Sequence, residues 1–510
     1  IIRNIFYLKS VYISSAIYTI ELFCTRKEPI TKENKQRHDA MFQYNTGQNG
    51  SAPEPYTKGE TQPAQCRDSL FAALFLGHLA GIIWMCSTYI PLAFSQISTD
   101  VNDDTALNFT LDSDTAKGII LMVVVPAVIG FLASLAGLAM IIACAKTIIH
   151  LSLVFSIAVS IIVVLASFAS GQMLGSIFAL LMLALTVCYY FAVRDRIPFA
   201  AANLNTATSA VKENLIGLLM STVFYDVLGF VYTVFWALGF YGVMISWGCI
   251  EEDGMCETSG TRGGIIFLIL LCAFWSTQVF MNCGQVTTAG TVGSWWFSPE
   301  ESGCFGSGIR GAWSRALTTS FGSICFGSLL VAIIQALKAM VQNERAQSDG
   351  PEILLCIVQC ILSCLEDIIE YFNKWAFVYV GLYGYGYVEA GKNVINLFKA
   401  RGWTTVITED LGSRAISFLT IILSLVVGCT GLVLKEVYSE YYGGLPWWGA
   451  YLTCFIISFV VIYVMFGVVD AALNTVIVCY AEAPSEFQQN HPLLSEEMRE
   501  AWIKVHPELF

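Results

Sequence analysis

The sequence predicts an all-α, polytopic membrane protein with about ten transmembrane helices. Three observations predict this class: the 510-residue chain is 56% hydrophobic, only 13% of its residues are charged, and its mean hydropathy is +0.64. Soluble domains carry about 25% charged residues, and so few charges could not cover the surface of a soluble protein of this size. The surface is therefore expected to face lipid over most of its area.

The order of apolar and polar stretches predicts three regions. Residues 1–67 are expected to form a cytoplasmic N-terminal tail, 68–480 a transmembrane transporter domain, and 481–510 a cytoplasmic C-terminal tail. Within the first region, Ile1–Cys24 is mildly apolar and is interrupted by charges, which favours a peripheral amphipathic segment over an additional span. The polar stretch Thr25–Arg67 is typical of a disordered tail.

Ten apolar runs are long enough to cross a bilayer, which takes roughly 20 residues of helix. They are Leu70–Phe94, Gly118–Ala143, Ile148–Phe168, Gly171–Val193, Leu215–Ile245, Gly264–Gln285, Leu317–Leu337, Ile353–Tyr383, Ile416–Leu434 and Ala450–Val478. The glycine-rich stretch Gly381–Gly386 is expected to break the helix at the end of the eighth run.

Basic residues predict the orientation, because cytoplasmic loops carry an excess of Lys and Arg. With both termini in the cytoplasm, the inner loops hold more basic residues than the outer loops. The inner set is Lys146, Arg194, Arg196, Lys212, Arg310, Arg315, Lys392, Lys399, Arg401 and Arg414, and the outer set is Lys117, Arg262, Lys338, Arg345 and Lys435. The segment Lys338–Glu352 is the exception, because it carries two basic residues on the expected outer side.

Two features of the expected outer loops favour the same orientation. Asn108 begins an Asn-Phe-Thr glycosylation acceptor, which is modified only on the luminal or extracellular side. Cys249 and Cys256 lie in an acidic outer loop, where an oxidising compartment favours a disulfide over the alternative of two reduced thiols.

The sequence lacks the motifs that mark most classes of catalytic and cofactor site. The net charge of −12 excludes a nucleic-acid binder of the usual basic kind. The chain has neither a phosphate-binding P-loop motif nor a nucleophile elbow, and no histidine has a partner at metal-ligand spacing. The three cysteines Cys356, Cys360 and Cys364 share one helical face, which favours buried apolar residues over a metal site. We expect no enzyme activity, no cofactor and no metal.

Ionisable residues inside the apolar runs are the strongest functional signal, because a charge in the membrane is unfavourable unless it is paired or faces water. Asp226 lies in the fifth run, Glu366, Asp367 and Glu370 in the eighth, and Asp470 in the last. Such residues either pair helices or line an aqueous path for a polar or cationic solute.

Aromatic residues accompany several of these acids, and aromatic rings beside a carboxylate can hold a quaternary ammonium group by cation–π attraction. Glu389 follows a cluster of tyrosines that runs from Tyr379 to Tyr387. The expected substrate-binding residues are Tyr225, Asp226, Trp236, Trp275, Tyr383 and Glu389.

Four stretches of the chain resemble the choline transporter-like family of solute carriers, in its fungal and protist branch. They are Phe274-Trp275 through Trp295-Trp296-Phe297; Phe321-Gly322-Ser323 through Leu330 with Gln335; Cys360, Cys364-Leu365-Glu366 and Asn373; and Asp470, Thr475 and Val478-Cys479-Tyr480-Ala481-Glu482. This resemblance implies ten spans, cytoplasmic termini, a glycosylated first outer loop, a plasma-membrane location and facilitated transport, with choline as the substrate best associated with the animal members.

These observations together predict a membrane transporter for choline or a related small organic cation, working by alternating access without ATP hydrolysis. The alternative is a non-transporting membrane scaffold or lipid-contacting protein, which polar tails and close helix packing would also suit. The expected partners are the small-molecule substrate and the lipid bilayer, with no nucleic acid. The sequence leaves the oligomeric state open.

Overall fold

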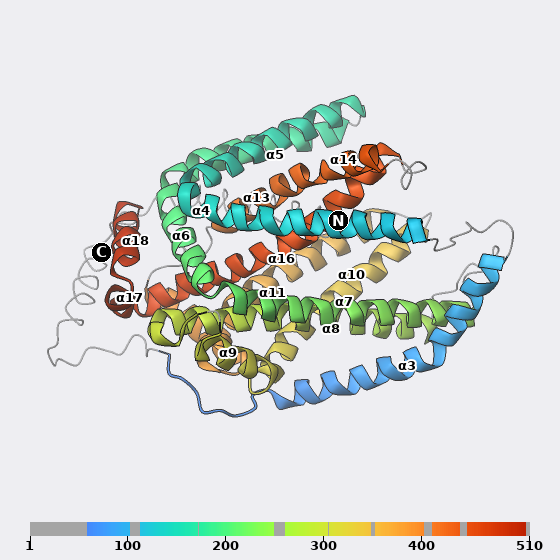
Figure 1. The fold of residues 1–510 in the computed structure, drawn as a ribbon, viewed down its shortest axis with the longest axis horizontal. Coiled ribbons are helices and arrows are strands. Elements are labelled where there is room, and N and C mark those ends of the chain that lie inside the picture. Colours follow the sequence, from blue (N-terminus) through green and yellow to red (C-terminus); the bar gives the residue numbers. More distant parts are fainter. Residues whose placement is uncertain are drawn as a thin grey trace.

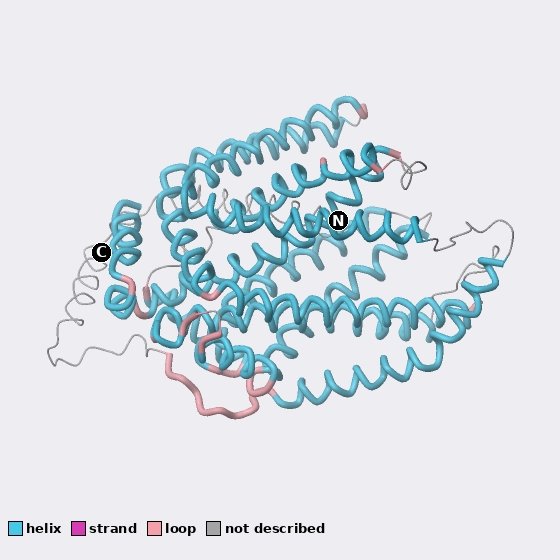
Figure 2. Tube along the Cα trace, in the orientation of Figure 1, coloured by secondary structure: helices cyan, strands magenta, loops and turns pink. Residues whose placement is uncertain are grey.

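The computed structural model describes residues 59–102, 113–171, 173–248, 261–303, 305–347, 352–401, 411–438 and 446–505. Across these ranges the regular structure is helical, and no strand occurs (Figure 2). The predicted all-α class is therefore confirmed. Asn108, Cys249 and Cys256 lie outside the described residues.

Long apolar helices form a bundle whose axes run roughly along one direction (Figure 1). Eight helical segments of the described chain are long and apolar enough to cross a membrane. The helices that make up the bundle are α3 (Ser69–Asn102), α4 (Ser113–Ala169), α5 (Met173–Val193), α7 (Leu215–Ser246), α8 (Thr261–Phe297), α10 (Phe321–Gln347), α11 (Glu352–Tyr383), α13 (Leu411–Gly428) with α14 (Thr430–Val437), and α16 (Trp447–Glu482).

Two details reconcile these eight segments with the ten predicted spans. Helix α4 has 57 residues, about 86 Å of helix, which is far longer than a bilayer core of about 30 Å. Its backbone leaves the helical region at Cys144, where the two predicted runs adjoin, and the chain turns back there (Figure 1). Helix α11 supplies the tenth span, although its acidic residues keep it outside the strictly apolar set.

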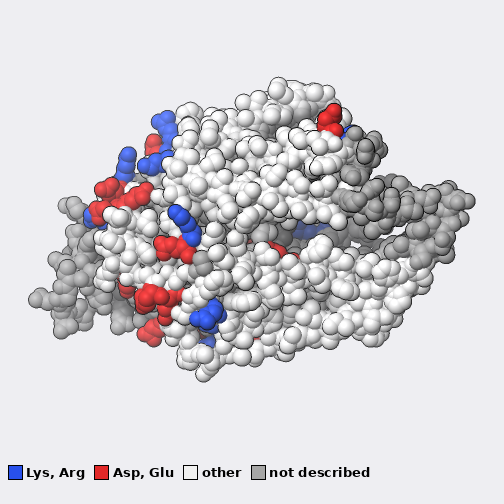
Figure 3. Space-filling view, viewed as in Figure 1, with Lys and Arg blue, Asp and Glu red and all other residues white. Residues whose placement is uncertain are grey.

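Shorter helices lie together at one end of the bundle. They are α6 (Ile197–Glu213), α9 (Ser307–Leu317), α12 (Tyr387–Ala400), α17 (Pro484–Asn490) and α18 (Pro492–Val505), with the single turns η2 (Arg194–Arg196) and η3 (Pro299–Glu301). Most charged side chains visible in Figure 3 gather at this end. We call it the polar end, and the other end the opposite end.

The C-terminal helices pack firmly onto the polar end. Trp296, on the last turn of α8, stacks on Phe487 of α17 with ring centroids 4.0 Å apart and donates its indole N–H to the carbonyl oxygen of Ala483. The Asn490 amide caps α8 by donating to the carbonyl oxygens of Trp296 and Phe297. Trp502 of α18 is fully buried. Residues 484–505 are thus a structural part of the bundle.

The predicted end of the seventh run is wrong. The seventh run was expected to end at Leu337, with Lys338 in an outer loop, but α10 continues to Gln347 and Lys338 lies inside the helix. The physical reason is that Lys338 is paired with Glu366 of α11, so its charge is neutralised within the bundle. A hydropathy pattern registers the charge but not its partner.

Candidate functional site

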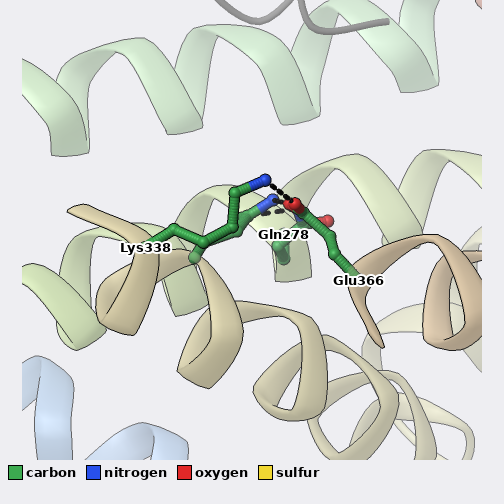
Figure 4. A network of polar contacts seen from close by, with 4 residues as sticks. Gln278, Lys338 and Glu366 are labelled. Carbon is green, nitrogen blue, oxygen red and sulfur yellow. Dashed lines mark hydrogen bonds and ion pairs between the residues drawn. The ribbon is translucent and has the colours of Figure 1, made fainter. Parts of the chain in front are cut away.

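A polar network joins the three helices α8, α10 and α11 (Figure 4). The Nζ atom of Lys338 on α10 donates to Glu366 Oε2 on α11. The amide of Gln335, one turn earlier on α10, donates to Glu366 Oε1 at 2.9 Å, and Gln278 on α8 donates to Gln335 Oε1 at 3.2 Å. We call these four residues the α8–α10–α11 network.

The two charged side chains of this network are largely buried, so each needs a partner. The side chains of Lys338 and Glu366 are only 15% and 14% exposed, and Glu366 lies near the middle of the 32-residue α11. An isolated charge at the centre of a membrane helix costs about 2.5–3.5 kcal/mol on the insertion scale. Lys338 and the Gln335 amide each donate to one oxygen of the Glu366 carboxylate, so neither charge is left without compensation.

Further polar contacts extend from this network toward the polar end. Asn282 of α8 donates to Ser328 Oγ of α10 at 2.9 Å, and Asn373 of α11 donates to the carbonyl oxygen of Gly327 at 3.0 Å. The Tyr387 hydroxyl of α12 donates to Asn373 Oδ1. Burial raises the pKa of Tyr387 above its ordinary value. Helices α8, α10 and α11 therefore enclose a column of polar side chains.

A group of tyrosines and one carboxylate lies where α11 ends. The rings of Tyr379 and Tyr383 are 5.3 Å apart, and each lies 6.2 Å from the ring of Tyr385. The Tyr383 hydroxyl donates to Glu482 Oε2 at 2.7 Å, from α11 to the last residue of α16. Glu482 is 6% exposed. We call these four residues the tyrosine–Glu482 cluster.

The backbone between α11 and α12 gives this cluster its shape. As the sequence predicted, the glycine-rich stretch interrupts the helix, because α11 stops at Tyr383 and α12 begins at Tyr387. Gly384 has a φ of +77°, which L side chains rarely adopt, so a glycine allows the sharp turn. The turn brings Tyr385 back against the tyrosines on the last turns of α11.

The segment 59–68 runs along the polar end (Figures 1 and 2) and contacts the tyrosine–Glu482 cluster. The backbone N–H of Gly59 donates to Glu482 Oε1, and the N–H of Glu60 donates to the Tyr385 hydroxyl at 3.3 Å. A Cβ atom on Gly59 would lie 2.6 Å from the Tyr383 ring, so glycine is needed for this approach. In this conformation the segment shields the carboxylate from solvent on that side.

A second aromatic group surrounds His78 on α3. The His78 ring stacks on Trp275 of α8 with centroids 5.0 Å apart, and its Nε2 lies 2.9 Å from Ser276 Oγ. The Trp275 indole N–H donates to the carbonyl oxygen of Cys325 on α10 at 2.9 Å. Phe75 packs edge-on against Trp275 at 5.3 Å. These contacts fix Trp275 in the interior, between α3, α8 and α10.

The three predicted site residues on α7 differ in their burial and in their position along the bundle. Tyr225 is buried, with its hydroxyl 3.2 Å from Thr287 Oγ1 of α8. Asp226 is partly buried, and its Oδ2 atom is buried without a hydrogen-bond partner among the described residues. Trp236 lies nearer the opposite end, where its indole N–H donates to the carbonyl oxygen of Ile269 at 3.0 Å.

The six predicted residues do not form one site. Tyr225 and Asp226 are neighbours on α7, Trp275 belongs to the aromatic group around His78, and Tyr383 belongs to the tyrosine–Glu482 cluster. Glu389 is exposed on the first turn of α12, and no contact with the other five is seen.

Sequence reasoning missed two features of this region. It proposed Glu389 as the carboxylate beside the tyrosines, whereas Glu482 contacts them from 99 residues further along the chain than Tyr383. It also noted Glu366 without its partner Lys338. The available signal was that Glu482 and Glu366 both fall within the stretches that carry the family resemblance.

Comparison with known proteins agrees with the architecture. Residues 177–485, more than half of the chain, match the family model described as plasma-membrane choline transporter. Similar proteins include Protein PNS1 of Mycosarcoma maydis, which is 26% identical over 489 residues, covering 92% of this chain and 90% of that protein. Protein PNS1 of Kluyveromyces lactis is 26% identical over 89% of this chain and 85% of its own length.

A protist relative shares a shorter region. The CTL-like protein of Dictyostelium discoideum is 29% identical over 329 residues, which are 63% of this chain and 55% of that protein. Proteins of this family are membrane transporters and not enzymes. With its helical membrane bundle and its match to the family model, this chain belongs to the choline transporter-like family.

Proposed function

We propose that this transporter carries choline or a related small organic cation by alternating access, without ATP hydrolysis. The observation that carries the proposal is the tyrosine–Glu482 cluster, in which three buried aromatic rings adjoin one buried carboxylate. Aromatic faces attract a quaternary ammonium group, with about 0.5–2 kcal/mol for each favourable contact, and the carboxylate supplies the opposite charge.

The proposed path leads from this cluster along the interior of the bundle. Trp275, Tyr225 and Asp226 contribute aromatic surface and a carboxylate with an unpartnered oxygen, and Trp236 lies further toward the opposite end. Because Glu389 is exposed and Glu482 is buried against Tyr383, we assign the carboxylate role beside the tyrosines to Glu482.

In the closed arrangement seen here, the cation's place at Glu482 is taken by a backbone N–H group. Gly59 donates to Oε1 while Tyr383 donates to Oε2, so both carboxylate oxygens have donors. A cation reaching Glu482 from the polar end therefore requires segment 59–68 to move away. This is the gating step that alternating access demands at this end.

We also propose the cellular setting that the sequence favours. The polar end faces the cytoplasm at the plasma membrane, Asn108 is glycosylated, and Cys249 and Cys256 form a disulfide on the other side. The excess of basic residues in the loops of the polar end supports this orientation. Non-reducing peptide mapping tests the disulfide, and its absence from protein purified under oxidising conditions would refute it.

The direct test is uptake of radiolabelled choline into proteoliposomes that contain the purified chain. We expect saturable uptake that excess unlabelled choline abolishes and that ethanolamine reduces. Correctly folded protein that gave no saturable flux of choline or any other organic cation would contradict the proposal. That result would instead favour the alternative, a membrane scaffold or lipid-contacting protein.

A further inference from the structure

The Lys338–Glu366 ion pair joins two different helices, α10 and α11, and both of its side chains are largely buried (Figure 4). Each oxygen of Glu366 accepts a hydrogen bond from α10: Oε1 from the neutral amide of Gln335, and Oε2 from the charged Nζ of Lys338. Gln335 is itself held by Gln278 of α8. The amides therefore position the carboxylate, and Lys338 neutralises it.

A structural role alone does not explain why this position is ionic. Apolar residues of similar volume usually stabilise a buried site at least as well as an ion pair does, because they avoid the desolvation of two charges. Ionisable residues that persist inside membrane bundles generally mark ion or substrate pathways. Glu366 also lies in line with the column of polar contacts that leads through Asn282 and Asn373 to the polar end.

We propose that Glu366 is a second binding site for the transported cation. Lys338 is then a tethered cation that neutralises Glu366 whenever the substrate is absent. This inference rests on the proposed function. A cationic substrate and the Lys338 ammonium carry the same charge, so one can replace the other at Glu366 without leaving the carboxylate uncompensated.

The geometry allows such an exchange. Lys338 lies about two-thirds of the way along α10, one turn nearer the opposite end than Gln335, and its flexible four-carbon stem lets the ammonium turn in that direction. Gln335 remains to hold Glu366 in place while Lys338 is displaced. When the substrate leaves, the ammonium returns, and the empty carrier can change conformation with a neutral interior.

The test separates two modes of transport in proteoliposomes with radiolabelled choline. In net uptake the vesicles start without choline, so the carrier must return empty in every cycle. In exchange the vesicles are loaded with unlabelled choline, so the carrier returns loaded and does not need Lys338. We expect Lys338→Met to lower net uptake about tenfold or more and to change exchange by less than about twofold.

Three further variants complete the test. Lys338→Arg keeps the charge and should retain net uptake, while Glu366→Gln should lower both modes. Lys399→Met is the control, because Lys399 is exposed on the last turn of α12. It should leave both modes unchanged. Preserved exchange by Lys338→Met also demonstrates that this variant is folded.

Two results would overturn the inference. If Lys338→Met lowered net uptake and exchange by the same factor, or lowered neither, the ion pair would have only a structural role, and the proposed function would stand. If the wild-type chain carried no organic cation in either mode, the proposed function would fail and this inference with it.

Discussion

The carboxylate side chains of this protein differ mainly in the groups that contact them. Glu366 is paired with Lys338, Glu482 accepts hydrogen bonds from Tyr383 and Gly59, and Glu389 is exposed to solvent. Asp226 differs from all three, because one of its oxygens is buried without a partner among the described residues. The sequence could show that Asp226 and Glu366 lie in apolar runs. It could not show that Lys338 pairs with Glu366, or that one oxygen of Asp226 lacks a partner, because both depend on how the helices pack.

The unpartnered oxygen of Asp226 leads to a prediction that separates function from stability. Asp226→Asn removes a poorly compensated charge from the membrane, so we expect the thermal unfolding midpoint in detergent to stay level or rise. Choline uptake should fall about tenfold, since the substrate loses an opposite charge on its path. Uptake and thermal unfolding are measured on the same preparation.

Asp195→Asn is the control for this prediction, because the Asp195 side chain is 87% exposed at the polar end. It should change neither quantity. A lower midpoint with unchanged uptake for Asp226→Asn would show that Asp226 is a structural residue, and it would remove Asp226 from the path.

At the scale of helices, the sequence predicted where the chain crosses the membrane better than where each helix ends. Helix α8 was expected to end at Gln285 but runs to Phe297, and α10 continues past Leu337 to Gln347. Hydropathy registers the apolar part of a helix, whereas the hydrogen-bonded helix continues into the polar regions. The short helices α6, α9 and α12 were missed for the same reason, because they are too polar or too short to resemble spans.

Close contact between α3 and α7 depends on a glycine. A Cβ atom on Gly242 would overlap the backbone carbonyl of Tyr89, which cannot move aside as a flexible side chain would. We therefore expect Gly242→Ala to separate the two helices and to lower stability by about 1–3 kcal/mol, seen as a lower thermal midpoint in detergent.

Gly81 provides a matched control on the same helix pair, because a Cβ atom there would meet nothing within 4 Å. Gly81→Ala should leave the midpoint unchanged or raise it slightly, since alanine favours helix by about 1 kcal/mol over glycine. Equal midpoints for the two variants would show that α3 and α7 do not need this close approach.

For the molecule as a whole, the even number of spans brings both described ends of the chain to the polar end. Segment 59–68 contacts the tyrosine–Glu482 cluster there, and α17 and α18 pack on α6 and α8. The sequence predicted that both termini share one side, from the ten apolar runs and the loop charges, with the Asn108 acceptor and the two outer-loop cysteines as support. It could not predict that residues 484–505 are packed, because the partners of Phe487 and Trp502 lie on α8 and α6.

The orientation of the bundle is testable through the loop between α3 and α4. If the polar end faces the cytoplasm, Asn108 is on the luminal side during synthesis and should be glycosylated. Immunoblots of the protein from eukaryotic cells should then show a mobility shift that endoglycosidase and Asn108→Gln both remove.

The control places an acceptor in the connection between two helices at the polar end. Val406→Asn creates an Asn-Ile-Thr acceptor between α12 and α13, and it should stay unmodified. Glycosylation at residue 406 and not at Asn108 would reverse the proposed orientation.

The central claim is that the transporter recognises the positive charge of its substrate through the tyrosine–Glu482 cluster. The most direct measurement is competition against radiolabelled choline uptake by 3,3-dimethyl-1-butanol, which has the shape of choline without the charge. In the wild type we expect this alcohol to compete at least about tenfold more weakly than unlabelled choline.

Glu482→Gln keeps an acceptor for the Tyr383 hydroxyl but removes the charge, so it should weaken choline uptake and abolish this discrimination. Glu500→Gln, at an exposed position on α18, should retain both. Equal competition by choline and the neutral alcohol in the wild type, or full discrimination in Glu482→Gln, would contradict the account.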